Sequence, residues 1–137
     1  MGRILAFDYG TRRTGVAVSD PLQMFAQPLD TIPTENLAHW LHRYLMSESV
    51  EAFVVGIPSR FDGSDTHASE PVRLFIQALK GAYPDIPVYT MDERLSSREA
   101  SNSLLQSGVS KKRRQDKKLL DTVSAALILQ TYLQSRS

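Results

Sequence analysis

The chain has 137 residues, which is long enough for one domain with a sizeable hydrophobic core, and we expect a single domain over residues 1–137. Its formal net charge of +1 does not by itself indicate a nucleic-acid-binding protein. The absence of cysteine excludes disulfides and thiolate metal sites and fits a reducing compartment. Because no apolar run approaches the ~20 residues of a membrane span and no signal-peptide pattern is present, we expect a cytoplasmic protein without a membrane segment.

The first pattern in the chain is a β-hairpin over residues 4–20. An apolar run from Ile4 ends at the carboxylate of Asp8, a polar turn follows over residues 9–14, and a second β-prone run continues to Ser19. We expect Gly10 to supply a positive φ in this turn. A charged Asp8 at the end of a buried strand is costly unless it is compensated, either by a metal ion or by hydrogen bonds from turn amides. Both interpretations of Asp8 remain open from this stretch.

Further strands and helices follow, with turn residues between them. The expected elements are a strand over 24–29 with Pro28 near an edge, a helix N-capped by Thr34 and running to about 45, a strand over 52–58, a helix over about 70–81, a strand over 87–91, a helix over 96–106 and a last helix over 119–133. Residues 60–69 are expected to form a polar loop, and residues 110–118 form a basic run.

The order of these elements predicts an α/β fold. Short turns join the first three strands, which favours an antiparallel meander, and helices separate the later strands, which favours parallel pairing with right-handed crossovers. We therefore expect a mixed five-stranded sheet flanked by helices on both faces. Functional sites of such sheets gather at the carboxyl ends of strands, where Asp8 and Glu93 fall in the sequence.

Three acids form the candidate catalytic and metal-binding site: Asp8, Glu93 and Asp121, the last one early in the final helix. Converging carboxylates repel one another, and bound divalent cations would remove that repulsion. Carboxylate sites suit Mg²⁺ or Mn²⁺, and two such ions can promote phosphodiester hydrolysis. The structural alternatives are a surface salt bridge between Glu93 and Arg94, and an exposed first-turn Asp121 that is stabilised by the helix dipole.

Four motifs together resemble the YqgF (RuvX) family of Holliday-junction-resolvase-like nucleases. They are Phe7-Asp8-Tyr9-Gly10-Thr11-Arg12-Arg13-Thr14-Gly15-Val16-Ala17-Val18-Ser19-Asp20, Gly56-Ile57-Pro58 with Asp62-Gly63-Ser64, Asp92-Glu93-Arg94-Leu95-Ser96-Ser97 with Glu99-Ala100, and Asp121 with Ser124-Ala125-Ala126 and Ile128-Leu129-Gln130. The resemblance implies a ribonuclease H-like fold, catalytic metal-binding roles for Asp8, Glu93 and Asp121, and processing of the 16S ribosomal RNA precursor at its 5′ end. Ser124 replaces an alanine that is frequent in the family, and we expect no consequence.

Basic residues are the candidates for contacts with nucleic-acid phosphates. They are Arg12, Arg13, Arg60 and Arg94 together with the dense run Lys111, Lys112, Arg113, Arg114, Lys117 and Lys118. The alternative for the run is a solvated basic loop. His67 is a candidate proton shuttle in the polar loop, whereas a surface role is expected for His39 and His42.

The leading hypothesis is a Mg²⁺- or Mn²⁺-dependent nuclease that acts on precursor ribosomal RNA, in contact with a ribosome-assembly particle, as a monomer or a homodimer. A resolvase of branched DNA is the first alternative. An actin-like ATPase is a second, because its phosphate loop also has an acid-Tyr-Gly-Thr character, but such proteins use two domains and no Walker-type sequence is present. A non-catalytic RNA-binding assembly factor is the third.

Overall fold

The computed structural model describes residues 2–57, 69–92 and 117–136. Its elements, in chain order, are β1 (Arg3–Asp8), β2 (Arg13–Ser19), β3 (Ala26–Pro33), the 3₁₀ turn η1 (Thr34–Asn36), α1 (Leu37–Ser47), β4 (Val50–Ile57), α2 (Ser69–Ala82), β5 (Val88–Asp92) and α5 (Lys117–Ser135). The expected helix over 96–106, the polar loop and the basic run up to residue 116 lie outside the described residues.

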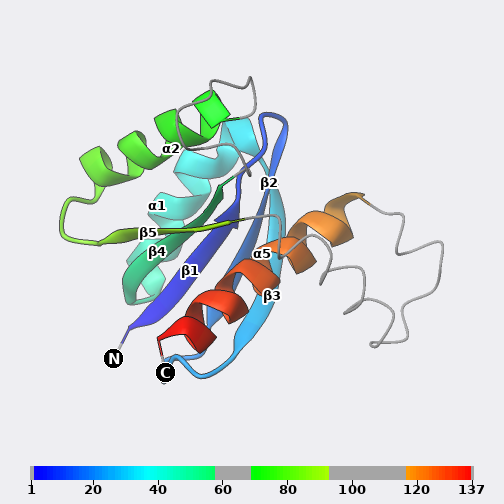
Figure 1. Ribbon diagram of the computed structural model, residues 1–137. Helices are drawn as coiled ribbons and strands as arrows, with labels where there is room; N and C mark the ends of the chain where they lie inside the picture. The colour runs from blue at the N-terminus through cyan, green and yellow to red at the C-terminus, as the bar shows by residue number, and fades with distance from the viewer. Residues whose placement is uncertain (1, 58–68, 93–116, 137) are drawn as a thin grey trace.

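The strands form one mixed sheet in the order β3-β2-β1-β4-β5 (Figure 1). β1 pairs antiparallel with β2, and β2 pairs antiparallel with β3, whereas β4 is parallel to both β1 and β5. The expected meander followed by parallel strands is therefore confirmed. Because β1, β4 and β5 run in the same direction, their carboxyl ends lie at one edge of the sheet, which we call the carboxyl edge.

The two faces of the sheet bury different kinds of side chain. Large residues such as Leu5, Phe7 and Phe53 pack with Leu41 of α1 and Ile76 of α2. On the opposite face, Ala6, Ala17 and Ala52 lie beneath α5 (Figure 1). Since alternate residues of a strand point to opposite faces, the alternation in β1 assigns one face to α1 and α2 and the other to α5. The small residues under α5 let this helix approach the sheet closely.

Strand β3 begins and ends later than the sequence pattern predicted. The expected strand over 24–29 was wrong at its start because the backbone N–H groups of Met24 and Phe25 donate to Asp20 Oδ1, at 2.9 and 2.8 Å, and so close a turn. Strand pairing continues to Pro33, which lies opposite Arg13 of β2. Pro28 does lie in an edge strand, where a residue without an N–H is tolerated.

Thr34 was also expected to cap the helix, and this prediction was wrong. A 3₁₀ turn precedes α1, and its Thr34 makes no side-chain cap. The Thr34 hydroxyl instead donates to the carbonyl oxygen of Gly10 at 2.5 Å and lies 2.9 Å from the hydroxyl of buried Thr14. Tertiary hydrogen bonds of the β1–β2 turn therefore replace the local cap.

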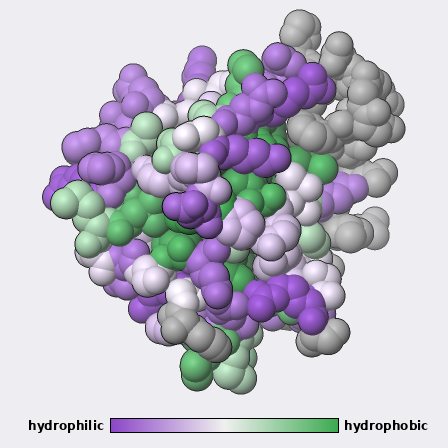
Figure 2. Space-filling model, turned by 90° about the vertical axis from the view of Figure 1, so that its left-hand side faces the viewer, coloured by the Kyte–Doolittle hydropathy of each residue, from purple (hydrophilic) through white to green (hydrophobic). Residues whose placement is uncertain are grey.

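The surface is mostly hydrophilic on the face drawn in Figure 2, where hydrophobic side chains are gathered mainly in the middle. Three exposed hydrophobic side chains, Leu22, Met24 and Phe25, lie in the β2–β3 turn. In the part of the chain that the structure describes, no helix has the length and apolar character that crossing a membrane requires.

The docking of α5 can be tested at Leu129, whose side chain is 0% exposed. Leu129→Ala leaves a cavity between α5 and the sheet and should lower the free energy of unfolding by about 2–5 kcal/mol. Leu74→Ala on α2 is the matched control, because Leu74 is 55% exposed and its truncation should change stability by less than about 0.5 kcal/mol. Urea unfolding of both variants measures the difference, and equal losses would contradict this account of the core.

Candidate active site at the carboxyl edge of the sheet

Asp8 is the last residue of β1 and lies half-buried at the carboxyl edge. Ile4 and Ala6, two and four residues earlier, pack in the core beneath α5. Strand alternation therefore assigns Asp8 to the α5 face of the sheet. In the neighbouring strand Asp8 is paired with Gly15, which has no side chain to extend over the carboxylate.

A hydrogen bond places the beginning of α5 over the same part of the sheet. Thr31 of β3 lies opposite Gly15, so Asp8, Gly15 and Thr31 form one row across three strands, about 10 Å from end to end. The Thr31 hydroxyl is hydrogen-bonded to the hydroxyl of Thr122, the residue that follows Asp121. Asp121 itself belongs to α5, but its side chain lies outside the described part of the structure.

The turn after Asp8 is held on the opposite face. The Tyr9 ring stacks on Phe75 of α2, with centroids 4.5 Å apart and an interplanar angle of 20°. Gly10 was expected to adopt a positive φ, and this was wrong. Glycine is needed there because a Cβ would lie 2.5 Å from the carbonyl oxygen of Arg13. Close approach of two backbone segments therefore explains Gly10, and anchoring of Tyr9 and Gly10 positions the end of β1.

The last residues of the first motif have structural contacts. The Ser19 hydroxyl accepts a hydrogen bond from the Ile4 N–H at 2.8 Å and is fully buried. The N–H of Phe25, followed by that of Met24, stabilises the carboxylate of Asp20 and lowers its pKa. Ser19 and Asp20 therefore close the far end of the hairpin, away from the carboxyl edge.

Of the basic candidates, the structure describes the side chains of Arg12 and Arg13. Arg12 is exposed in the β1–β2 turn, and Arg13 begins β2, so both lie at the carboxyl edge near Asp8. Lys117 and Lys118 belong to the first turn of α5, with side chains outside the described part. The candidates Arg60, His67, Glu93, Arg94, Lys111, Lys112, Arg113 and Arg114 lie outside the described residues.

Of the three candidate acids, the structure describes the side chain of Asp8. Among the described residues, no group of three or more His, Cys, Asp or Glu side chains is arranged to hold a metal ion. The structure also contains a groove between β3 and α1, with Trp40 and Tyr44 in its wall, which was not predicted from the sequence. The helical spacing of these two aromatic residues was its only signal.

Comparisons with known proteins agree with this fold and cover almost the whole chain. The family described as "RuvX: Holliday junction resolvase" matches residues 2–135. A protein of Porphyromonas gingivalis named "Putative pre-16S rRNA nuclease" is 45% identical over 98% of both chains. Proteins of the same name from Bacteroides thetaiotaomicron and Flavobacterium johnsoniae are each 42% identical over 99% of both chains.

Solved structures show the same architecture at low sequence identity. Thermus thermophilus RuvC in complex with a Holliday junction substrate has a TM-score of 0.58 at 16% identity and covers 99% of this chain and 96% of its own. A second T. thermophilus RuvC structure has a TM-score of 0.51 at 15% identity, covering 98% of this chain and 95% of its own. The expected ribonuclease H-like fold is therefore confirmed.

The fold and these relatives define a nuclease, an enzyme that hydrolyses phosphodiester bonds. The chain belongs to the RuvX (YqgF) family.

The close approach at Gly10 predicts a local cost for any side chain there. Gly10→Ala should lower the free energy of unfolding by about 1–3 kcal/mol, because a backbone carbonyl must move to admit the methyl group. Gly81→Ala, in the last turn of α2, is the matched control. Its Cβ would have no neighbour within 4 Å, so alanine should stabilise the helix by about 0.4–1 kcal/mol. Thermal melts measure both, and a neutral Gly10→Ala would disprove the packing explanation.

Proposed function

We propose that this nuclease cuts the precursor of 16S ribosomal RNA in the cytoplasm during ribosome assembly. The support is the set of relatives at 42–45% identity, over almost their full length, that carry the name pre-16S rRNA nuclease. Branched DNA is the second candidate substrate, because the matching family is described as Holliday junction resolvase.

The proposed catalytic residues are Asp8, Glu93 and Asp121. The observation that carries this proposal is that Asp8 lies on the α5 face of the sheet and that α5, which contains Asp121, is held over the same part of the sheet. Asp8 follows Ile4 and Ala6 on the α5 face, and Asp121 precedes buried Ala125 by one helical turn.

The alternation in β5 argues against Asp92 as the second acid of the site. Met91 packs in the core beneath α5, and Tyr89 stacks on Tyr132 of α5, with centroids 5.4 Å apart. Odd-numbered positions of this strand therefore belong to the α5 side, whereas Asp92, at an even position, belongs to the other side. Asp92 therefore does not share the face of Asp8, and we propose Glu93, the acid that the family motif implies, as its partner.

Nucleases of this fold generally use a divalent metal ion. We propose Mg²⁺ or Mn²⁺, because a donor set of three carboxylates suits hard cations. When bound, such an ion supplies water activation and stabilisation of the leaving oxygen. The carboxylates of Asp8, Glu93 and Asp121 hold the ion.

Basic side chains hold the substrate in this proposal. Arg12 and Arg13 are placed at the carboxyl edge to contact phosphates beside the cleaved bond. The other proposed phosphate contacts are Arg60, Arg94, Lys111, Lys112, Arg113, Arg114, Lys117 and Lys118. These contacts supply affinity that falls as salt concentration rises.

Cleavage assays test the acids and the substrate together. Asp8→Asn, Glu93→Gln and Asp121→Asn should each reduce cleavage by more than about 100-fold, since even partners behind metal ligands are worth 10–100-fold. Asp85→Asn, an exposed acid between α2 and β5, should cleave as the wild type does. The substrates are a 16S precursor fragment and a four-way DNA junction, with Mg²⁺ or Mn²⁺ added. Cleavage of the junction alone would replace the RNA assignment, and activity in an acid variant would remove that residue from the site.

Thermal melts test the shared metal site without a substrate. Two like charges at ~4 Å cost about 4 kcal/mol at an effective dielectric of ~20, and screening and proton uptake should leave a strain on the order of 1 kcal/mol. Asp8→Asn should therefore raise the melting temperature in EDTA. Millimolar Mn²⁺ should stabilise the wild type, as expected for a ligand of the folded state, and should stabilise the variant much less.

A lower melting temperature of Asp8→Asn would indicate a structural role for Asp8. If Asp8 only accepts hydrogen bonds from its turn, asparagine loses a charge-assisted hydrogen bond and the variant melts at a lower temperature. A destabilised Asp8→Asn protein with an undiminished Mn²⁺ shift would show that Asp8 is not a metal ligand.

A further inference from the structure

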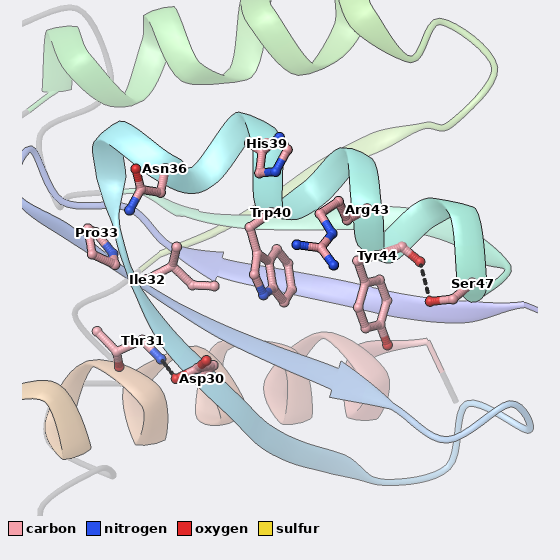
Figure 3. A pocket seen from close by; sticks show the side chains of 10 residues that line it. All are labelled: Asp30, Thr31, Ile32, Pro33, Asn36, His39, Trp40, Arg43, Tyr44 and Ser47. Atoms are coloured by element: carbon pink, nitrogen blue, oxygen red, sulfur yellow. Dashed lines mark hydrogen bonds between the residues drawn. The ribbon is translucent and has the colours of Figure 1, made fainter.

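A groove runs between the outer strand β3 and helix α1 on the face of the sheet opposite α5. Its volume is about 690 Å³, within the range of about 300–1,000 Å³ that is typical of ligand sites. Figure 3 shows its lining side chains, which are Asp30, Thr31, Ile32, Pro33, Asn36, His39, Trp40, Arg43, Tyr44 and Ser47.

Two stacked aromatic rings form one wall of this groove. Trp40 and Tyr44 are one helical turn apart, with centroids 5.2 Å apart and an interplanar angle of 17°. Both rings are half-buried and extend from α1 toward β3, and exposed Arg43 lies beside them (Figure 3). A flat apolar surface next to a guanidinium is suited to a nucleobase with its phosphate, because stacking needs no particular base and the cation pairs with the backbone.

The groove begins close to the candidate active site. Pro33, which lines the groove, pairs with Arg13 of β2. Thr31 lies in the same row of the sheet as Asp8, about 10 Å away. Exposed Arg12 lies in the β1–β2 turn, between Asp8 and the groove. Its carbonyl oxygen accepts a hydrogen bond from the Thr34 N–H at 3.0 Å. A strand that leaves the carboxyl edge would therefore pass Arg12 and Arg13 before it reaches Trp40.

The edge of β3 argues against an extended peptide in the same place. Pro28 and Pro33 cannot donate ladder hydrogen bonds, and the register between β2 and β3 shifts between Val16 and Ala17. An interrupted edge with two prolines is a poor template for an added strand. The stacked rings and the Arg43 guanidinium remain as the features that a ligand could use, and the Asp30 carboxylate also lines the groove.

We propose that this groove binds an unpaired base of the nucleic-acid strand that continues from the cleavage site. The inference rests on the proposed nuclease function and specifies its substrate: a structured RNA with a single-stranded segment beside the cleaved bond. Trp40 and Tyr44 stack the base, Arg43 holds its phosphate, and Arg12 and Arg13 guide the strand over the turn. The groove thereby favours tailed substrates over blunt duplexes.

Trp40 provides a direct probe, because it is the single tryptophan of the chain. The experiment uses the full chain with Asp8→Asn, so that no cleavage is expected, and compares a blunt RNA duplex with the same duplex carrying a single-stranded tail. The tailed RNA should bind more tightly and quench the tryptophan emission, whereas the blunt duplex should leave the emission unchanged. Fluorescence anisotropy of labelled RNA gives the affinities in parallel.

Variants on either side of the molecule separate stacking from general packing. Trp40→Leu should weaken binding of the tailed RNA by about 5- to 100-fold, as expected for one lost stacking contact, and should leave the blunt duplex unaffected. Trp40→Phe should recover part of the affinity. Tyr89→Leu removes the exposed ring of the Tyr89–Tyr132 stack at the other edge of the sheet and should leave the affinity for both RNAs unchanged. Arg43→Gln should weaken binding of the tailed RNA and leave binding of the blunt duplex unchanged. Lys80→Gln on α2 is its matched control and should leave both affinities unchanged.

The outcomes distinguish the groove from the function on which it rests. Two results would disprove base binding in the groove and leave the nuclease proposal standing. One is tight binding of tailed RNA without quenching of the tryptophan emission. The other is an unchanged affinity of a Trp40→Leu protein whose melting temperature is also unchanged. If Trp40→Leu does not fold, the affinity of Arg43→Gln for the tailed RNA and the quenching of the Trp40 emission decide the question. If no RNA binds at all, both proposals fail.

Discussion

The packing of α5 on the small-residue face of the sheet is the constraint on which the candidate site depends. Ala6, Ala17 and Ala52 leave room for the helix to approach the strands, and Ala125 and Leu129 fill the interface with no exposed surface. This contact fixes the height and direction of α5 over β1. The Thr31–Thr122 hydrogen bond then fixes the position of its first turns along the sheet. An acid on a helix thereby comes under the same geometric control as an acid on a strand.

The first family motif, residues 7–20, contributes contacts at both ends of the β1–β2 hairpin. At the carboxyl edge, Asp8 ends β1, and Gly10 permits the close approach of Arg13 that turns the chain. At the other end, the Ser19 hydroxyl accepts a hydrogen bond from the Ile4 N–H, and the Asp20 carboxylate accepts one from the Phe25 N–H. A continuous run of family-like residues thus combines a chemical group with the contacts that hold it. Asp8 and the neighbouring Arg12 and Arg13 lie at the carboxyl edge, where we propose that the substrate binds.

The two faces of the sheet also separate two tasks. Bulky side chains such as Phe7 and Phe53 form the larger core beneath α1 and α2, where the Tyr9–Phe75 stack secures the turn after Asp8. The α5 face has the smaller core and carries the acid. The groove lies between the edge strand β3 and α1, on the face opposite α5. A strand bound in the proposed way would therefore pass from one face of the sheet to the other at Arg12 and Arg13. Stability, chemistry and the proposed strand path therefore use different surfaces of the same sheet.

Local patterns were sufficient to predict the order of strands and helices, the mixed sheet and Asp8 at a strand end, because apolar periodicity and turn residues act over a few neighbouring positions. The motifs were also sufficient for the family. Tertiary contacts decided the rest. Thr34 bonds to Gly10 instead of capping α1, Met24 and Phe25 close a turn on Asp20 instead of starting β3, and Gly10 is needed for a close approach instead of a positive φ. The groove around Trp40 likewise exists only where α1 meets β3. Each of these features depends on groups distant in sequence that meet in space, and a periodic pattern contains no record of such a meeting.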